Sequence, residues 1–325
     1  MARNQYSHIS TSQLAKIVGV SQGTVDRAIN GRKGISEATK GRILTAARTY
    51  GYLPDRPLAA AGKEGHRSLL YGVVLFDLNN EYFSRFTMDF EELCRSVGYN
   101  SVLMFSHNDR QTEIDCLNQL VHTGVDGIVL CSVGAGEEYS AYVRSLPLPV
   151  VTVGNRLCGV PHVGIDDRAA MRELTEYALR RGYKELFYYA PVLKKRTASK
   201  ENLYAQEERH AGFSEVIAAA GIRARTLTDQ DELLALLPPP SCRCAVLCPT
   251  DLYALRLRVA LREIGREDVG IAGFDGCDLL DTCGLPTDTV SYDREALTSG
   301  VYRLLNDPTA TQPPIPHRLC LRGSL

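Results

Sequence analysis

A short polar cluster near the amino terminus carries the side chains needed to recognise DNA base pairs. Gln22, Asp26 and Arg27 lie close together, and Gly23 has no side chain to obstruct a close approach. A guanidinium can donate two parallel hydrogen bonds to guanine, an amide can pair with adenine, and a carboxylate can accept from the amino group of cytosine. These residue types predict direct contact with bases in the major groove, with Arg27 as the main base-reading residue.

Two short helices joined by a tight turn are predicted to present this cluster. Ser10 stands at an N-cap position and Gln13 completes a capping box, so a first helix is expected over 11–18. A glycine permits the turn, and Ser21 caps a second helix expected over 22–29. The apolar side of the first helix is predicted to consist of Leu14, Ile17 and Val18.

The second helix is predicted to have one packed face and one free face. The residues expected to pack are Val25, Ala28 and Ile29. The residues expected on the free face are Gly23, Asp26, Arg27 and Asn30. A third helix is predicted after Ser36, with Ile43, Ala47 and Tyr50 on its packed face and Gly51 at its C-cap. The alternative is a small helical bundle with a solvated polar face, because such patterns also arise by chance.

Charge is divided unevenly along the 325 residues. Residues 1–67 contain 11 Lys and Arg against 4 Asp and Glu, whereas residues 68–325 contain 26 against 34. A basic segment on an acidic remainder predicts a polyanionic partner for the amino-terminal segment alone.

Nothing in the sequence predicts export, membrane insertion or a metal site. There is no apolar signal region and no window of about 18 apolar residues, so we expect a cytoplasmic protein without membrane contact. The 10 cysteines are scattered through apolar runs, as at Cys94, Cys131 and Cys248, without the spacing of metal ligands. We therefore expect buried free thiols and no cofactor.

From residue 69 onward, short apolar runs alternate with helical periodicity, which is typical of repeated β-α units and parallel sheets. One set of strands is predicted at 69–76, 101–105, 127–131 and 149–153. A second set is predicted at 186–190, 224–227, 245–248 and 269–273. Two doubly wound lobes of this kind bind ligands in a cleft at the carboxyl ends of their strands.

Polar and aromatic side chains follow these strands. The candidates are Asn80, Tyr82, Phe83, Asn155, Arg156, Asp166, Arg209 and Asp275. Charged planar groups form paired hydrogen bonds with adjacent hydroxyls, and aromatic faces cover the apolar side of a sugar ring. The alternative is that Tyr82 and Phe83 begin a buried helix and the charges pair at the surface.

The first fifty-odd residues resemble the DNA-binding headpiece of the lactose-repressor (LacI/GalR) family, through VGVSQGTVDRAING and ISEATKGRILTAARTYGYLPD. The resemblance implies that Gln22, Gly23 and Arg27 read bases. It also implies that the residues contacting the DNA backbone are Ser10, Ser21 and Asn30. Asp26 departs from the serine usual in the family, so it either pairs with Arg27 or a base, or narrows the choice of operator.

Residues 54–67, PDRPLAAAGKEGHR, have the composition of a linker. In the resembling family this segment forms a hinge helix in the DNA-bound dimer and inserts a leucine into the minor groove. Alanine stands at the usual position here, and Leu58 is the only large apolar side chain available. Either Leu58 takes that role from a shifted helix, or this protein bends DNA less.

The rest of the chain resembles the periplasmic-binding-protein-like effector domain of the same family. The motifs are NNEYF, VVTVGNR, VGIDD, EERHAGF, VGIAGFDG and LCLRGS. The resemblance implies that the eight candidates above line an effector pocket, with Arg209 and Asp275 foremost. The resemblance adds two pocket positions at which this sequence departs from the family. Thr250 stands where the family commonly has Asn, and Tyr292 stands where it commonly has Gln. Four basic residues in 192–206 suggest a phosphorylated or acidic sugar, or only a solvated loop.

These observations predict an α/β protein whose domains are a three-helix helix-turn-helix domain (1–53), a hinge (54–67) and a two-lobed effector and dimerisation domain (68–325). Lobe 1 is expected at about 68–167 and 293–315, and lobe 2 at about 168–292 and 316–325. We expect a homodimeric repressor that binds a double-stranded operator and responds to a sugar. A solute-binding protein or a sugar-metabolising enzyme is the alternative, although no Walker-type loop, HExxH or Gly-x-Ser-x-Gly is present.

Overall fold

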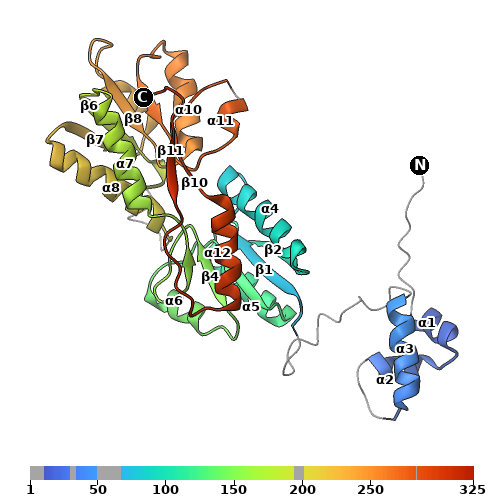
Figure 1. Cartoon of the computed structure of the whole chain (residues 1–325). Coiled ribbons are helices and arrows are strands. Elements are labelled where there is room, and N and C mark those ends of the chain that lie inside the picture. Colours follow the sequence, from blue (N-terminus) through green and yellow to red (C-terminus); the bar gives the residue numbers. More distant parts are fainter. Residues whose placement is uncertain (1–10, 30–33, 50–66, 194–200, 283) are drawn as a thin grey trace, which may run out of the picture. The chain divides into compact units, whose positions relative to one another are not determined.

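The computed structural model in Figure 1 describes residues 11–29, 34–49, 67–193, 201–282 and 284–325. Its internal contacts divide the chain into two units, Met1–Ser68 and Leu69–Leu325. Among the described residues, no helix is long and apolar enough to cross a membrane. The predicted positions outside the described residues are Ser10, Asn30, Tyr50, Gly51 and Leu58.

The first unit contains three helices, α1 (Thr11–Val18), α2 (Gln22–Ile29) and α3 (Glu37–Thr49). The predicted bounds of the first two are confirmed. The Ser21 hydroxyl accepts from the Thr24 amide at 3.2 Å, so this residue caps α2 as predicted. The buried core of this first unit consists of Leu14, Ala15, Val18, Val25, Ala28, Ile43 and Ala47. The prediction for Ile17 is wrong: its side chain is 46% exposed, because α2 and α3 pack on the face that carries Ala15.

Lobe 1 of the second unit is built on a parallel sheet with the strand order β2-β1-β3-β4-β5. Its strands are β1 (Leu70–Leu75), β2 (Asn100–Phe105), β3 (Gly127–Leu130), β4 (Val150–Val153) and β5 (His162–Val163). Its helices are α4 (Glu81–Ser96), α5 (Arg110–Thr123), α6 (Glu137–Arg144) and the late α12 (Arg294–Asn306). Helix α12 packs against α4 and β4, so the chain returns to this lobe near its end.

Lobe 2 repeats the arrangement with the strand order β7-β6-β8-β9. Its strands are β6 (Glu185–Tyr189), β7 (Arg223–Leu227), β8 (Cys244–Leu247) and β9 (Gly270–Ala272). Its helices are α7 (Asp167–Arg180), α8 (Tyr204–Ala220), α9 (Gln230–Leu236), α10 (Asp251–Glu263) and α11 (Leu279–Thr282). Helices α7 and α8 approach so closely that a Cβ on Gly212 would lie 2.3 Å from the Arg168 carbonyl oxygen.

An antiparallel pair, β10 (Thr289–Tyr292) and β11 (His317–Cys320), connects the two lobes. Val290 belongs to the core of lobe 2, whereas Tyr292 belongs to the core of lobe 1. This pair was not predicted, and neither were β5 and the helices α6, α9, α11 and α12. The sequence prediction of two doubly wound parallel sheets is confirmed.

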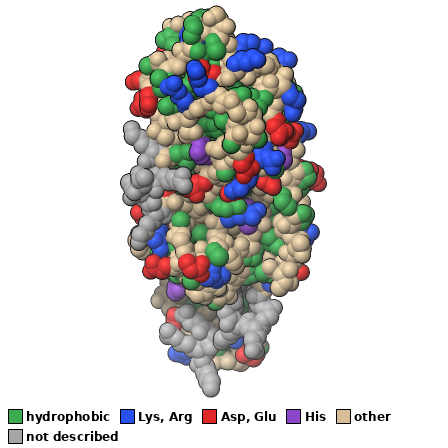
Figure 2. All heavy atoms as spheres, turned by 90° about the vertical axis from the view of Figure 1, so that its left-hand side faces the viewer, with side chains coloured by type: hydrophobic (Ala, Val, Ile, Leu, Met, Phe, Trp, Pro, Cys, Tyr) green, Lys and Arg blue, Asp and Glu red, His purple; other side chains and the backbone are tan. Residues whose placement is uncertain are grey.

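Figure 2 shows one face of the molecule, on which the described acidic and basic side chains are interspersed. The described side chains on that face do not form a basic stripe of the kind that binds nucleic acids. The predicted buried thiols Cys94, Cys131 and Cys248 are buried and unpaired. No group of His, Cys, Asp and Glu able to hold a metal occurs among the described residues.

Candidate functional site

Helix α2 turns its polar side chains away from the core of the first unit. Val25 and Ala28 are buried, whereas Gln22, Gly23 and Arg27 are exposed and Asp26 is half-buried. The guanidinium of Arg27 extends back over Gly23, where an added Cβ would lie 3.9 Å from it. A Cβ at this distance would make only an ordinary van der Waals contact, so the packing of Arg27 does not itself require glycine at position 23.

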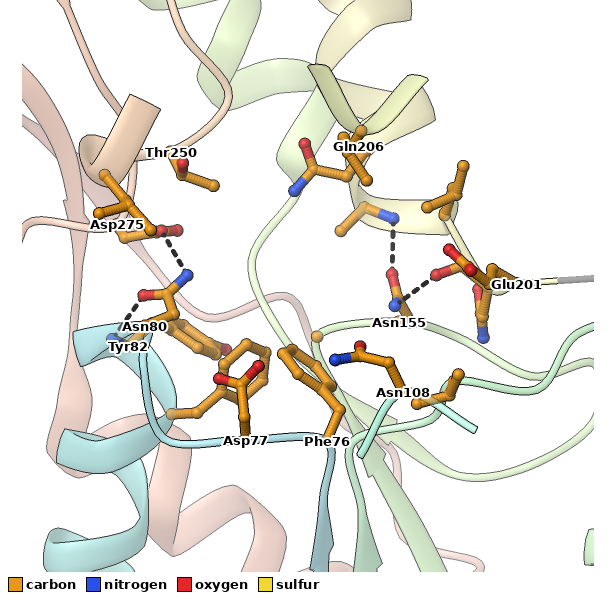
Figure 3. Close-up of a pocket in the computed structure, with 18 of the residues that line it drawn as sticks. Phe76, Asp77, Asn80, Tyr82, Asn108, Asn155, Glu201, Gln206, Thr250 and Asp275 are labelled. Carbon is orange, nitrogen blue, oxygen red and sulfur yellow. Dashed lines mark hydrogen bonds between the residues drawn. The ribbon is translucent and has the colours of Figure 1, made fainter. Parts of the chain in front are cut away.

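A second candidate site is a cavity of about 320 Å³ between the two lobes. Strands β1, β2, β6 and β8 end around it, as expected for doubly wound sheets. Figure 3 shows Phe76, Asp77 and Asn80 on its lobe 1 side and Gln206, Thr250 and Asp275 on its lobe 2 side. The predicted residues that line it are Asn80, Tyr82, Phe83, Asn155, Arg209, Thr250 and Asp275.

Arg209 is held rigidly at one end of the cavity. Its Nε donates to Asp167 Oδ1 at 2.8 Å, and its NH1 donates to Asp275 Oδ1 at 3.2 Å and to the Pro249 carbonyl at 2.5 Å. The guanidinium also lies 3.7 Å from the centre of the Phe274 ring. Burial lowers the pKa of this guanidinium, but the two carboxylates more than offset that effect, so it remains charged.

Asp275 connects the lobes at the same end of the cavity. Its Oδ2 accepts from the Asn80 amide at 3.2 Å, as the dashed line in Figure 3 shows. Burial raises the pKa of Asp275 to about 6, while Arg209 and Asn80 act in the opposite direction. Its φ of 114° is a backbone conformation that favours glycine, so the surrounding bonds must hold this aspartate in a strained position.

Asp251, which the sequence analysis did not select, orders the loop that carries Asp275. Its Oδ2 accepts from the Cys277 amide at 2.8 Å and its Oδ1 from the Thr289 hydroxyl at 2.6 Å. Burial and, to a smaller extent, the charge of Asp275 raise the pKa of Asp251 to about 7, while the hydrogen bonds from Cys277 and Thr289 oppose that rise. The neighbouring Thr250 caps α10, because its hydroxyl accepts from the Tyr253 amide at 3.3 Å.

Asn155 joins the lobes at the opposite end of the view in Figure 3. Its Nδ2 donates to the Asn202 carbonyl at 2.7 Å and its Oδ1 accepts from the Ala205 amide at 3.1 Å. The backbone amide of Asn202 in turn donates to the Val133 carbonyl at 2.7 Å. The Asn155 side chain is therefore occupied by contacts between lobes, which limits its capacity to bind a ligand.

A third connection lies outside the cavity wall. The Glu81 carboxylate accepts from the Asp278 and Leu279 amides, each at 3.1 Å, and Arg85 donates to Glu81 at 3.0 Å. Arg85 also pairs with Asp278. Direct hydrogen bonds between described residues thus connect the two lobes at these three places.

Three predicted residues do not line the cavity. Asp166 caps α7 by accepting from the Ala169 amide at 2.9 Å, and the adjacent Asp167 reaches Arg209 instead. Asp166 is the extended N-cap residue and its carboxylate is used for capping, whereas Asp167 is the first residue of the helix and its carboxylate faces Arg209. The other two are Arg156, which lies 5.6 Å from the Tyr204 ring centre, and Tyr292, whose ring packs 5.0 Å from that of Tyr82.

Several lining residues were missed, although some follow strand ends and the same rule could have found them. Asp77 follows β1, and Asn108 follows β2 in a turn where its φ is 60° and that of His107 is 52°. Glu201 and Gln206 precede and begin α8. The segment 194–200, which holds the four basic residues considered above, lies outside the described residues.

A buried carboxylate orders one further wall of the cavity. Glu113 accepts from the Val133 amide at 2.7 Å, from the Gly134 amide at 3.1 Å and from the Ser132 hydroxyl at 3.2 Å. Burial raises the pKa of Glu113, and its hydrogen bonds oppose that rise. The bonds fix the loop after β3, from which Val133 reaches the cavity.

Comparison with known proteins places this geometry in a family. Residues 12–55 match bacterial regulatory proteins of the lacI family, and residues 68–237 match periplasmic binding proteins and the sugar-binding domain of the LacI family. The HTH-type transcriptional regulator Rv3575c of Mycobacterium tuberculosis is 30% identical over 307 residues, covering 85% of each chain. Catabolite control protein A of Staphylococcus xylosus is 24% identical, covering 97% of this chain and 99% of the relative.

A solved structure supports the fold over the same length. The transcriptional regulator CelR in complex with cellobiose has a TM-score of 0.65 and 23% identity, covering 97% of this chain and 99% of that chain. The chain belongs to the LacI family of bacterial regulatory proteins, and it is a DNA-binding transcriptional regulator modulated by a small molecule rather than an enzyme.

Proposed function

We propose that the protein is a homodimeric repressor whose α2 helices read a near-palindromic operator and whose inter-lobe cavity binds a sugar. The observation that carries the effector role is the Arg209–Asp275–Asn80 chain of hydrogen bonds at the cavity wall. A sugar hydroxyl pair presented there can exchange hydrogen bonds with both charged groups. The structurally similar regulator CelR was solved in complex with cellobiose, which supports a sugar as the class of ligand.

In the proposed operator complex, the exposed face of α2 enters the major groove. Arg27 donates to guanine, Gln22 pairs with adenine, and Gly23 permits close approach. Ser21 already uses its hydroxyl for the helix cap, so its contact with the DNA backbone would be made from the same fixed position. A symmetric dimer places two such helices one or more helical turns apart along the duplex.

The proposed coupling acts through the connections between the lobes. Asn80 and Asn155, which line the cavity, and Glu81, which lies outside its wall, make hydrogen bonds between the lobes that respond to any change in the arrangement of the lobes. A ligand that prefers one arrangement of the lobes shifts the equilibrium between arrangements and thereby the affinity for DNA.

Selection of operators from a random duplex library with the full chain, followed by fluorescence anisotropy with added sugars, tests the proposal. We expect Arg27→Ala to reduce the preference for selected over scrambled DNA by about 1–3 kcal/mol, while the response to sugar persists. Lys16→Ala is the control, because this exposed lysine of α1 lies outside the base-reading face. An unchanged preference in Arg27→Ala would rule out this base-reading role.

The effector half of the proposal has its own variant. Asp275→Ala removes the acceptor shared by Arg209 and Asn80, so we expect operator binding that no longer responds to sugar. Asp115→Ala, on the outer part of α5, serves as its control. A full sugar response in Asp275→Ala would contradict the role assigned to this carboxylate.

A further inference from the structure

The loop that carries Asp275 runs beside β10 and is bound to this strand through its backbone. The Asp275 amide donates to the Val290 carbonyl at 3.0 Å. Two positions earlier, the Gly273 amide donates to the carbonyl of Asp288, just before β10, at 2.8 Å. Strand β10 passes from the core of lobe 2 to the core of lobe 1. Asp275 is therefore positioned by the strand that connects the lobes, although it faces the cavity from the lobe 2 side.

Thr289, on β10, provides the side chain at the centre of these contacts. Its hydroxyl accepts from the Gly276 amide at 3.2 Å and donates to Asp251 Oδ1 at 2.6 Å. The other oxygen of the Asp251 carboxylate accepts from the Cys277 amide at 2.8 Å. The hydroxyl of Thr289 thus binds the residue directly after Asp275 and, through Asp251, the residue that follows it.

These side chains are withdrawn from water. Thr289 is completely buried, and Asp251 and Asp275 are only 2% and 7% exposed. A hydrogen bond is most costly to lose where water cannot replace the missing partner. Removal of the Thr289 hydroxyl takes one bond from the Asp251 carboxylate and one from the Gly276 amide, so the loop loses two of its attachments at once.

The conformation that these bonds hold is one that aspartate rarely adopts. The φ angles of Asp275 and Gly276 are 114° and 70°, and only the second of these residues is a glycine. A positive φ at a residue with a Cβ is unfavourable and persists only where the surroundings enforce it. In this conformation the Asp275 carboxylate accepts from Arg209 and from Asn80, each at 3.2 Å. A loop free to relax its backbone would move the carboxylate away from both partners.

We propose that Thr289 is a positioning residue for effector binding, whose hydroxyl holds Asp275 in the conformation that presents its carboxylate to the cavity. Thr289 is not among the described residues that line the cavity, so it acts through Asp251 and the loop 273–277. This inference rests on the proposed function, in which Asp275 binds the effector. It adds that effector affinity depends on a side chain of the strand that joins the lobes.

Matched variants separate this role from a general contribution to stability. Thr289→Val keeps the branched shape of the side chain and removes its hydroxyl, whereas Thr289→Ser keeps the hydroxyl. Thr175→Val is the control, because Thr175 is also completely buried but donates within α7, to the Met171 carbonyl at 2.7 Å. A purely structural role predicts that both valine variants lower the unfolding temperature and that neither changes the loop or the affinity for sugar.

Hydrogen–deuterium exchange of the full chain without ligand tests the positioning itself. In Thr289→Val we expect the amides of 273–277 to exchange about tenfold or more faster, while the amides of α5 in lobe 1 keep their rates. Thr289→Ser and Thr175→Val should retain the original exchange in this loop. Equal protection of 273–277 in Thr289→Val and in the original chain would overturn the inference.

Isothermal titration calorimetry measures the effect on binding, with glucose, galactose, xylose and cellobiose as probes, at a temperature where every variant is folded. For the sugar that the original chain binds most tightly, we expect Thr289→Val to raise the Kd about tenfold or more, because the conformation of Asp275 must be restored on binding. Thr289→Ser and Thr175→Val should keep the Kd within about threefold of the original. If Thr289→Val does not fold, Thr289→Cys takes its place, since a thiol is a weak donor and acceptor.

The outcomes distinguish this inference from the proposed function. An unchanged Kd in Thr289→Val, or an equal loss of affinity in Thr289→Ser, overturns the inference but leaves a sugar effector in place. If none of the sugars binds the original chain or changes its affinity for operator, the proposed sugar response fails, and the effector role of Thr289 fails with it. The exchange of 273–277 then decides by itself whether the hydroxyl positions Asp275.

Discussion

Replacement of Arg209 by methionine measures how much folding free energy is lost when two buried carboxylates at the cavity wall lose their cation. The side chains of Asp167 and Asp275 are only 8% and 4% exposed, and Arg209 is the cation that pairs with both. Methionine keeps an apolar contact with Phe274 but removes the charge and three hydrogen bonds. Breaking a buried ion pair in this way costs about 3–5 kcal/mol of folding free energy.

The penalty of Arg209→Met should grow with pH. Arg209 lowers the pKa of both carboxyl groups, so its removal raises them further above their unfolded values. The folded variant then holds protons that the unfolded chain has released, and stability falls as pH rises from about 4. The loss is therefore smaller at pH 5 than at pH 8.

Urea unfolding followed by near-ultraviolet circular dichroism measures this penalty, since the chain contains 16 Tyr and no Trp. The triple variant Arg209→Met, Asp167→Asn, Asp275→Asn removes all three charges and should recover most of the lost stability. A penalty below about 1 kcal/mol, or one that is equal at pH 5 and pH 8, would refute the reasoning, because Arg209 would then not be neutralising buried carboxylates.

The remaining predictions concern the scaffold of the cavity. Gly212→Ala should destabilise the effector domain by about 1–3 kcal/mol in thermal unfolding, because its Cβ would clash with the Arg168 carbonyl. The control Gly41→Ala in α3 has nothing within 4 Å and should stabilise the first unit by up to about 1 kcal/mol, so equal effects would contradict the packing argument. The original chain should lose stability as the pH rises from 5 to 8, because the folded pKa of Asp251, about 7, lies above its unfolded value. Asp251→Asn lacks this carboxyl group, so the difference in unfolding free energy between variant and original chain should shift in favour of the variant by about 2 kcal/mol or more over that range. Parallel pH profiles of unfolding for the two chains would exclude that role.

Local sequence patterns were sufficient for most elements. Capping residues and apolar spacing located α1 and α2 at their observed bounds, and the apolar runs located eight parallel strands within a residue or two. The rule that ligands bind at the carboxyl ends of strands selected Asn80, Arg209 and Asp275. These signals act over one turn of helix or a few residues of strand, so they survive without knowledge of the tertiary contacts.

The directions of individual side chains were less predictable. Ile17 fits the apolar spacing of α1 but remains exposed, because the positions of α2 and α3 decide which face is covered. Asp166 and Asp167 are adjacent carboxylates at the start of α7, and only their packing against α8 places the second beside Arg209. Local periodicity does not contain that choice.

The sequence by itself determined the family-like motifs, the two kinds of domain and the strand ends that supply polar residues. The tertiary structure decided which of those residues share a cavity, because the deciding contacts join positions far apart in the chain. Asn80 and Asp275 are separated by 195 positions, and their hydrogen bond exists only because β10 and α12 return the chain to lobe 1. The excess of carboxylates around Arg209 arises in the same way, since charges become coupled when folding removes the water between them.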